Sequence, residues 1–185
     1  MLGRVLLAAC ASLWIFPLHA EDTSAPVLTA QGTLQAAFAP WDDIEEIIKA
    51  SIDQAQQQVY VQAYLLTNKK IAGALIAAKR RGADVRVLAD ARRHAEVPSS
   101  RLADLASAEV GVWLETEYEN AHNKIIIIDA AMPRATVITG SFNFTWTAQH
   151  RNAENVLIAR NNPSLAAKYE LNWLRHQKAA LSFKK

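Results

Sequence analysis

Two spacings of apolar residues alternate along this chain, and they predict strands interleaved with helices. Short runs of β-branched and other apolar residues predict buried strands; they cover residues 34–39, 58–66, 85–89, 110–114, 125–128, 135–139 and 155–159. Apolar residues three or four positions apart predict helices; these cover about 43–55, 68–81 and 100–107, with a last helix starting at 163. The alternation indicates one α/β layered domain.

Residues with specific preferences at helix ends support the first two helices. Asp42 or Asp43 can cap the first helix, and Thr67 or Asn68 can cap the second. Gly82 suits the position just past the C-terminus of the second helix. The helix boundaries therefore follow from local chemistry as well as from periodicity.

The first 20 residues predict a secretory signal peptide. Arg4 precedes an apolar stretch at 5–16, and small residues precede the acidic start of the next segment. The apolar part is short for a membrane span; the alternative is an uncleaved N-terminal anchor. Residues 21–31 are expected to form a flexible lead-in, and 32–185 the folded domain. Removal of the leader takes away Cys10, the only cysteine, so the mature chain has no disulfide framework or cysteine metal site. These features predict export to a bacterial periplasm.

Residues 122–143 gather the chemistry of the chain. His122 and Lys124 stand two positions apart at the start of a strand of four isoleucines, so their side chains are expected on one side. Ser141 and Asn143 are also two apart and follow the next predicted strand. If the two strands are neighbours, an imidazole, an ammonium, a hydroxyl and an amide meet at one place.

These groups suit a tetrahedral oxyanion. Lys124, Ser141 and Asn143 supply hydrogen-bond donors, and the lysine adds positive charge. His122 can act as nucleophile or as acid and base near neutral pH. The stretch has no second His or Cys at metal-ligand spacing, and Asp129 is its only carboxylate, whereas a two-metal site needs several. The sequence predicts attack on a phosphate ester without a metal ion or other cofactor.

The pattern His122-x-Lys124-x4-Asp129, followed by Gly140-Ser141-x-Asn143, resembles the HKD signature of the phospholipase D superfamily. The similarity is strongest to short bacterial, periplasmic, EDTA-resistant endonucleases with one such motif per chain. The family usually has six residues between the Asp and the Gly-Ser pair, whereas this chain has ten, residues 130–139. The surplus falls on a predicted turn around Pro133, which need not disturb the strands.

The resemblance implies a fold, an assembly and roles for residues. The expected fold is a single-domain, mostly mixed β-sheet with helices on both faces. Because the family chemistry uses two histidines, one forming a phosphohistidine and the other protonating the leaving oxygen, a chain with one motif implies a homodimer. Glu154 corresponds to a carboxylate that orients the histidine, with a surface glutamate as the alternative. Asp129 and Gly140 are expected to be structural.

Residues 90–100 form a polar, basic segment that is expected to be a loop after a strand. Arg92, Arg93 and His94 can contact a nucleic-acid backbone there; a plain solvated loop is the alternative. Phe144 and Trp146 belong either to the core or to the border of a substrate groove. His176 is expected on an exposed face of the last helix.

The resulting hypothesis is a non-specific endonuclease that hydrolyses DNA, with RNA as an alternative. A net charge of only +2 means that DNA affinity must come from a local basic groove. One rival is a phospholipase acting on lipid headgroups, although lipid-cleaving relatives usually carry two motifs in longer chains. The other is a non-catalytic nucleic-acid or phospholipid-binding module, which would not need the imidazole.

Overall fold

A mixed β-sheet forms the centre of the molecule, with helices against both faces. The structure is a computed structural model that describes residues 25–184. Within that range the sheet has eight strands in the order β1-β7-β6-β5-β2-β3-β4-β8. Their bounds are β1 Thr33–Ala39, β2 Gln58–Ala63, β3 Asp84–Asp90, β4 Gly111–Glu115, β5 Lys124–Ile128, β6 Thr136–Gly140, β7 Glu154–Arg160 and β8 Leu181–Ser182.

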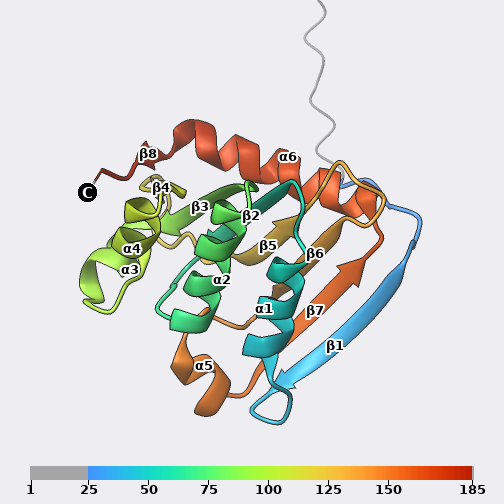
Figure 1. The fold of residues 1–185 in the computed structure, drawn as a ribbon, viewed down its shortest axis with the longest axis horizontal. Coiled ribbons are helices and arrows are strands. Elements are labelled where there is room, and N and C mark those ends of the chain that lie inside the picture. The colour runs from blue at the N-terminus through green and yellow to red at the C-terminus, as the bar shows by residue number, and fades with distance from the viewer. Residues whose placement is uncertain (1–24, 185) are drawn as a thin grey trace, which may run out of the picture.

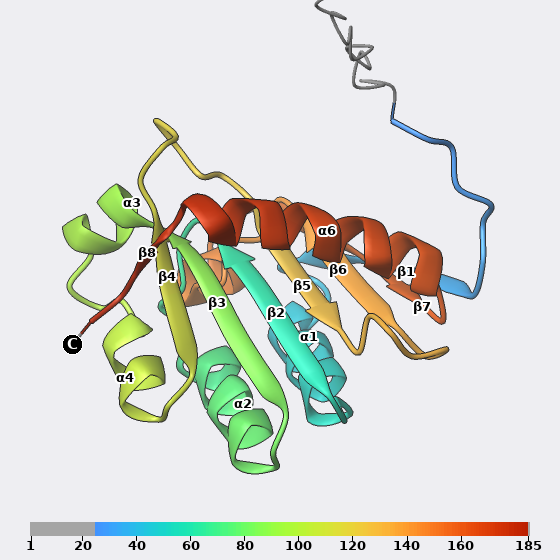
Figure 2. The same cartoon turned by 90° about the horizontal axis from the view of Figure 1, so that it is seen from above.

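The helices divide into two layers. One layer holds α1 (Ile44–Asp53), α2 (Lys69–Arg80), α4 (Leu102–Ser107) and α5 (Trp146–His150). Figure 2 shows α6 (Pro163–Ala179) crossing the other face, with α1, α2 and α4 on the far side of the sheet. The predicted α/β domain with helices on both faces is confirmed.

Strand direction follows from the connections. β2, β3 and β4 are parallel, because helices return the chain to the same starting edge. The pairs β2–β5, β5–β6, β6–β7 and β7–β1 are antiparallel. As a result β1, β2, β3, β4 and β6 end at one edge of the sheet, where β5 and β7 begin. This edge carries the candidate site.

The isoleucine strand β5 lies at the centre of two hydrophobic cores. Ile126 and Ile128 face the core beneath α1 and α2, whereas Ile125 and Ile127 face the core beneath α6. Alternating side chains on a strand point to opposite faces, so a run without polar positions requires cover on both sides. The prediction of a strand buried on both faces is confirmed.

Capping hydrogen bonds and backbone angles define the ends of the first two helices. The side chain of Asp43 accepts a hydrogen bond from the backbone N–H of Glu46, and that of Asn68 accepts one from Ile71. Gly82 follows the second helix with φ +96°, a left-handed conformation that suits glycine. These three predictions are confirmed.

Three short elements differ from the expectation. The segment 90–100 is not simply a loop, because Ala91–Glu96 forms helix α3, capped by the Asp90 side chain. Helix α5 and the two-residue strand β8 were also not predicted. The predicted signal peptide lies outside the described residues. No helix of residues 25–184 has the length and apolarity that a membrane crossing requires.

Candidate active site

The candidate site lies at the edge where β2, β3 and β6 end and where β5 and β7 begin. Lys124 opens β5 opposite Ala63, the last residue of β2. Gly140 ends β6 and pairs with Val156 of β7, two residues after Glu154, the first residue of that strand. The adjacent antiparallel strands β5, β6 and β7 thus bring the predicted motif residues to one edge of the sheet.

His122 and Lys124 are in direct contact. Lys124 Nζ lies 2.8 Å from His122 Nδ1 and donates to the His122 carbonyl oxygen at 2.7 Å. The imidazole is exposed, whereas only 6% of Lys124 is exposed. An ammonium can only donate, so Nδ1 accepts and a neutral His122 carries its proton on Nε2.

Tyr64, just after β2, lines the same place. Its ring centroid lies 4.3 Å from that of His122, and Lys124 Nζ lies 4.8 Å from the Tyr64 centroid. A cation above an aromatic face is stabilised by the ring. Tyr64 thus supports both motif side chains, a role that the sequence did not reveal because a tyrosine in a β-branched run is typical of a core strand.

The environment shifts both pKa values downward. Desolvation lowers the pKa of Lys124 to about 8, while the charge of Glu154 acts in the opposite direction. Desolvation, followed by the charge of Lys124, also lowers the pKa of His122, and Asp90 partly opposes this. His122 is therefore neutral at pH 7, and Lys124 is close to losing its charge just above that pH.

Ser141 and Glu154 form a second contact at this edge. The Ser141 hydroxyl donates to Glu154 Oε2 at 2.5 Å and accepts from the Asn155 backbone N–H at 3.1 Å. Glu154 Oε1 accepts from Asn152 at 2.9 Å. Within this single chain Glu154 contacts Ser141 rather than His122, so its role in orienting the histidine stays a prediction.

Gly140 and Asn143 flank Ser141. A Cβ on Gly140 would stand 2.2 Å from the Asn155 carbonyl oxygen, so glycine permits the close approach of β6 and β7. The Asn143 Oδ1 atom is buried and has no hydrogen-bond partner among the described residues. Because buried polar atoms are almost always paired, Asn143 is a candidate for a partner that this single chain does not supply.

Asp129 lies at the opposite end of β5 with φ +51°. Its carboxylate accepts the backbone N–H groups of residues 56, 57 and 58 and an Arg134 N–H at 3.0 Å. Burial opposes ionisation, but the backbone hydrogen bonds outweigh it and lower the pKa of Asp129. The longer turn supplies Arg134, and the β5–β6 register is unbroken, as expected for a longer hairpin tip.

The basic segment divides into two environments. Arg92 donates to the Glu119 carbonyl oxygen and to the Asn120 side chain, and Arg93 lies 6.0 Å from the Tyr64 ring. Arg92 therefore contacts the segment that leads to His122, and Arg93 lies beside Tyr64, which packs on His122. His94 instead is 7% exposed, and its Nδ1 lies 2.5 Å from Ser100 Oγ.

Burial changes what His94 can do. Desolvation lowers the pKa of His94 to about 4, with Asp90 acting in the opposite direction, so the ring is neutral at pH 7. A buried neutral ring facing Ser100 differs from the residue expected from the sequence, which would contact a nucleic-acid backbone, because α3 turns the ring inward.

Asp90 was not singled out in the sequence, yet its carboxylate accepts the backbone N–H of Arg93 and of Ala121, the residue before His122.

Two further expectations concern aromatic and histidine positions. Phe144 is 1% exposed and belongs to the core, whereas Trp146 is 55% exposed and borders a groove. His176 is not on a fully exposed face, because its Nδ1 lies 2.5 Å from the buried Glu115 carboxylate.

Among residues 25–184 no three His, Cys, Asp or Glu side chains gather in a way that could hold a metal ion.

The sequence is similar to known proteins over most of its length. Residues 48–176 match the family described as "Cardiolipin synthase, PLD-like domain". A protein of Rickettsia felis named "Phospholipase D" is 41% identical over 144 residues, which is 78% of this chain and 69% of that protein. The "Mitochondrial cardiolipin hydrolase" of Xenopus laevis is 29% identical over 161 residues, 85% of this chain and 74% of that protein.

Solved structures share the fold. Nuc from Salmonella typhimurium, a phospholipase D family member, matches with a TM-score of 0.76 and 29% identity, covering 83% of this chain and 99% of Nuc. NucT from Helicobacter pylori matches with a TM-score of 0.70 and 20% identity, covering 82% of this chain and all of NucT.

Proposed function

The chain belongs to the phospholipase D superfamily and is a phosphodiesterase of that family, and on this premise we propose that it is a metal-independent endonuclease. The substrate is DNA, with RNA as the alternative, and the expected location is the bacterial periplasm. The observation that carries the proposal is the exposed His122 imidazole in contact with the buried Lys124 ammonium. A nucleophile and a cation on one short segment supply covalent attack and phosphate binding.

Two copies of His122 complete the chemistry in a two-fold symmetric dimer. Nε2 of one neutral His122 attacks phosphorus and forms a phosphohistidine as the bond to the leaving oxygen breaks. That oxygen takes a proton from His122 of the partner subunit, which acts as the imidazolium because the negative charge of the bound phosphate favours its charged form. That second imidazole then takes a proton from water, and the water oxygen attacks phosphorus and breaks the P–N bond. The cycle returns both imidazoles to their starting states.

Lys124 couples phosphate binding to the state of His122. With Lys124 on Nδ1, the proton on Nε2 prevents attack by that nitrogen. An incoming phosphate attracts the Lys124 ammonium and frees Nδ1, which can then carry the proton and donate to a carboxylate. Glu154 of either subunit is the proposed acceptor, since such a pairing fixes the tautomer that leaves Nε2 free to attack.

A lipid phosphodiesterase is the second candidate. The names of the Rickettsia and Xenopus relatives favour it, because those names refer to phospholipids. The match over 99% of Nuc fits the resemblance to endonucleases with one such motif per chain instead.

One experiment separates these candidates. The chain without residues 1–20 is incubated in EDTA with supercoiled plasmid, with RNA and with phosphatidylcholine or cardiolipin vesicles, and His122→Asn protein serves as the control. We expect nicked and linear plasmid from the wild type only. Loss of cleavage in EDTA contradicts metal independence, and headgroup release with intact plasmid contradicts the nuclease.

A further inference from the structure

A groove of about 590 Å³ lies outside the His122 cluster, where α2, α4 and α5 begin. Its size falls in the range of ligand-binding sites, about 300–1,000 Å³. Its lining includes Glu45, Asn68, Lys69, Lys70, Arg101 and Trp146. The groove thus combines several cations with one exposed aromatic ring.

The cations of the groove differ in how far they are neutralised. Lys70 lies 3.6–4.0 Å from the carboxylates of Asp43, Glu45 and Glu46. Arg101 pairs with one exposed carboxylate, Asp104, at 2.8 Å. Within residues 25–184 no carboxylate lies at ion-pair distance from the exposed Lys69. Lys69 and Arg101 are therefore the groove's cations that are most available to an anion.

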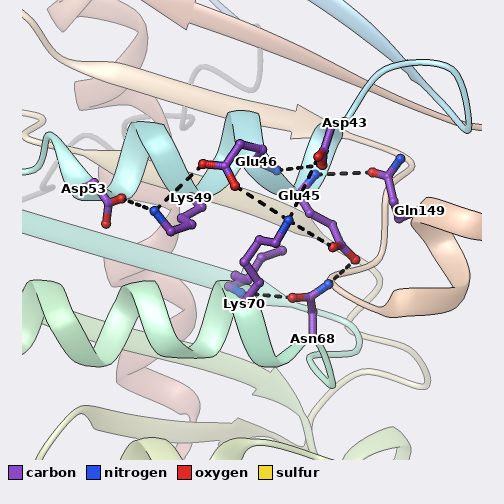
Figure 3. A network of polar contacts seen from close by, with 9 residues as sticks. Asp43, Glu45, Glu46, Lys49, Asp53, Asn68, Lys70 and Gln149 are labelled. Atoms are coloured by element: carbon purple, nitrogen blue, oxygen red, sulfur yellow. Dashed lines mark hydrogen bonds and ion pairs between the residues drawn. The ribbon is translucent and has the colours of Figure 1, made fainter.

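Trp146 stands on a firmly attached helix. Figure 3 shows Gln149 of α5 reaching Glu45 at the start of α1. Gln149 Oε1 accepts from the Glu45 backbone N–H at 3.3 Å, and Gln149 Nε2 donates to the Asp42 carbonyl oxygen at 2.9 Å. The buried Glu45 carboxylate in turn accepts from the side chain of Asn68. These bonds fix α5 beside the N-terminal ends of α1 and α2, as Figure 1 also shows.

The indole of Trp146 keeps an open surface. His150 packs against it with ring centroids 4.6 Å apart, and Arg151 lies 5.8 Å from its centroid. More than half of the residue, 55%, is still exposed. Neighbours that hold the ring in place lower the entropic cost of stacking a further flat group on it.

The groove is close to the active site along the chain. Tyr64 packs on His122, and three residues later Thr67 lines the groove. Three residues span at most roughly 11 Å. Backbone bonds from Phe144 to Leu65 and from Thr67 to Phe144 join this segment to the one that carries Asn143 and Trp146. A nucleic-acid strand bound at His122 therefore reaches the groove within a few nucleotides, since successive phosphates of such a strand are separated by about 3.4 Å of axial rise.

We propose that this groove binds an unpaired segment of the nucleic-acid substrate, with a base stacked on Trp146 and phosphates held by Lys69 and Arg101. The inference rests on the proposed nuclease function. Stacking requires an unpaired base, because a base within a duplex has both faces covered by its neighbours. The groove thus gives the enzyme a preference for single strands or frayed ends.

The test uses binding by the inactive His122→Asn protein to a fluorescent 12-nucleotide single strand and to a hairpin duplex. Adding Trp146→Ala should weaken single-strand binding by about tenfold or more and change duplex binding little, and Trp146→Phe should restore most of the loss. Lys69→Ala and Arg101→Ala should weaken binding and reduce its salt dependence. Lys168→Ala, on the exposed surface of α6, is the matched control without effect.

Activity and assembly measurements complete the test. In the active background, Trp146→Ala should reduce kcat/KM for the oligonucleotide while leaving hydrolysis of bis(p-nitrophenyl) phosphate unchanged, because that substrate has no strand to occupy the groove. Equal affinity of the Trp146→Ala protein for the single strand contradicts the inference. So does a change of oligomeric state in light scattering, which would make Trp146 a subunit contact. Wild-type protein that leaves nucleic acid intact contradicts the nuclease proposal instead.

Discussion

The two ends of β5 belong to one sequence motif but differ in how completely their polar groups are hydrogen-bonded. At the Asp129 end, one carboxylate accepts three backbone N–H groups and a guanidinium. At the other end, the His122 imidazole is exposed and Asn143 Oδ1 has no partner among the described residues. Satisfied polar groups add stability, whereas groups left available can bind substrate. The comparison supports a structural role for Asp129 and agrees with the chemical role proposed for His122.

The largest expected effect comes from removing the proposed nucleophile, His122. His122→Ala should lower phosphodiesterase activity by about 10⁴-fold or more, as loss of a covalent nucleophile does in other hydrolases. Because the side chain is exposed, thermal unfolding should shift by no more than about 2 °C. Plasmid nicking and calorimetry measure the two quantities. Retained activity contradicts the nucleophile assignment.

The next effect should appear at the opposite end of the strand and in stability. Asp129→Ala leaves backbone N–H groups at the start of β2 without acceptors, so the free energy of unfolding should fall by about 3 kcal/mol or more. Denaturant titration measures this change, and activity per folded molecule should be nearly unchanged. Asp129→Asn, which tolerates positive φ, is the milder control.

The charge of Asp129 also predicts a pH dependence of stability. Its pKa is lower in the folded chain than in the unfolded chain, so the stabilisation is present above the unfolded value of about 3.9. It is lost as the pH falls through the folded value. The acid loss should be smaller in Asp129→Asn. Identical acid profiles for the two proteins would argue against a stabilising carboxylate.

The smallest effect concerns pH and substrate binding. Lys124 has a pKa of about 8, so it is charged below pH 8 and neutral above it. Oligonucleotide affinity of the His122→Asn protein should therefore decline as the pH rises through about 8. Adding Lys124→Arg should remove this decline, since arginine keeps its charge. An unchanged decline in the Lys124→Arg protein would assign it to another group.

Most of the sheet and the helices could be predicted because the sequence patterns that indicate them lie within single short segments. The four isoleucines required burial on both faces, and Asp43, Asn68 and Gly82 marked helix ends by their own chemistry. The pairing of His122 with Lys124 followed from their spacing. Family membership then followed from the same motif.

The parts that escaped prediction depend on contacts between distant residues. Helix α5 has five residues and is held by Gln149, which bonds to groups more than 100 positions away. His94 belongs to a basic, polar segment, and only the fold of α3 shows that it faces inward. Tyr64 looks like a core residue until β2 and β5 are paired. A five-residue helix is too short to show a helical pattern in the sequence. A residue that contacts the motif only in the folded chain has no sequence pattern of its own that reveals this role.

The tip between β5 and β6 has a practical consequence. It lies one strand length, roughly 17 Å, from the reactive edge, and Arg134 ties it to Asp129 while Ala131 and Pro133 are exposed. A fluorescent dye, an affinity tag or a surface tether attached at Ala131 would report on the enzyme from a distance without entering the space that the proposed nucleic-acid substrate would occupy.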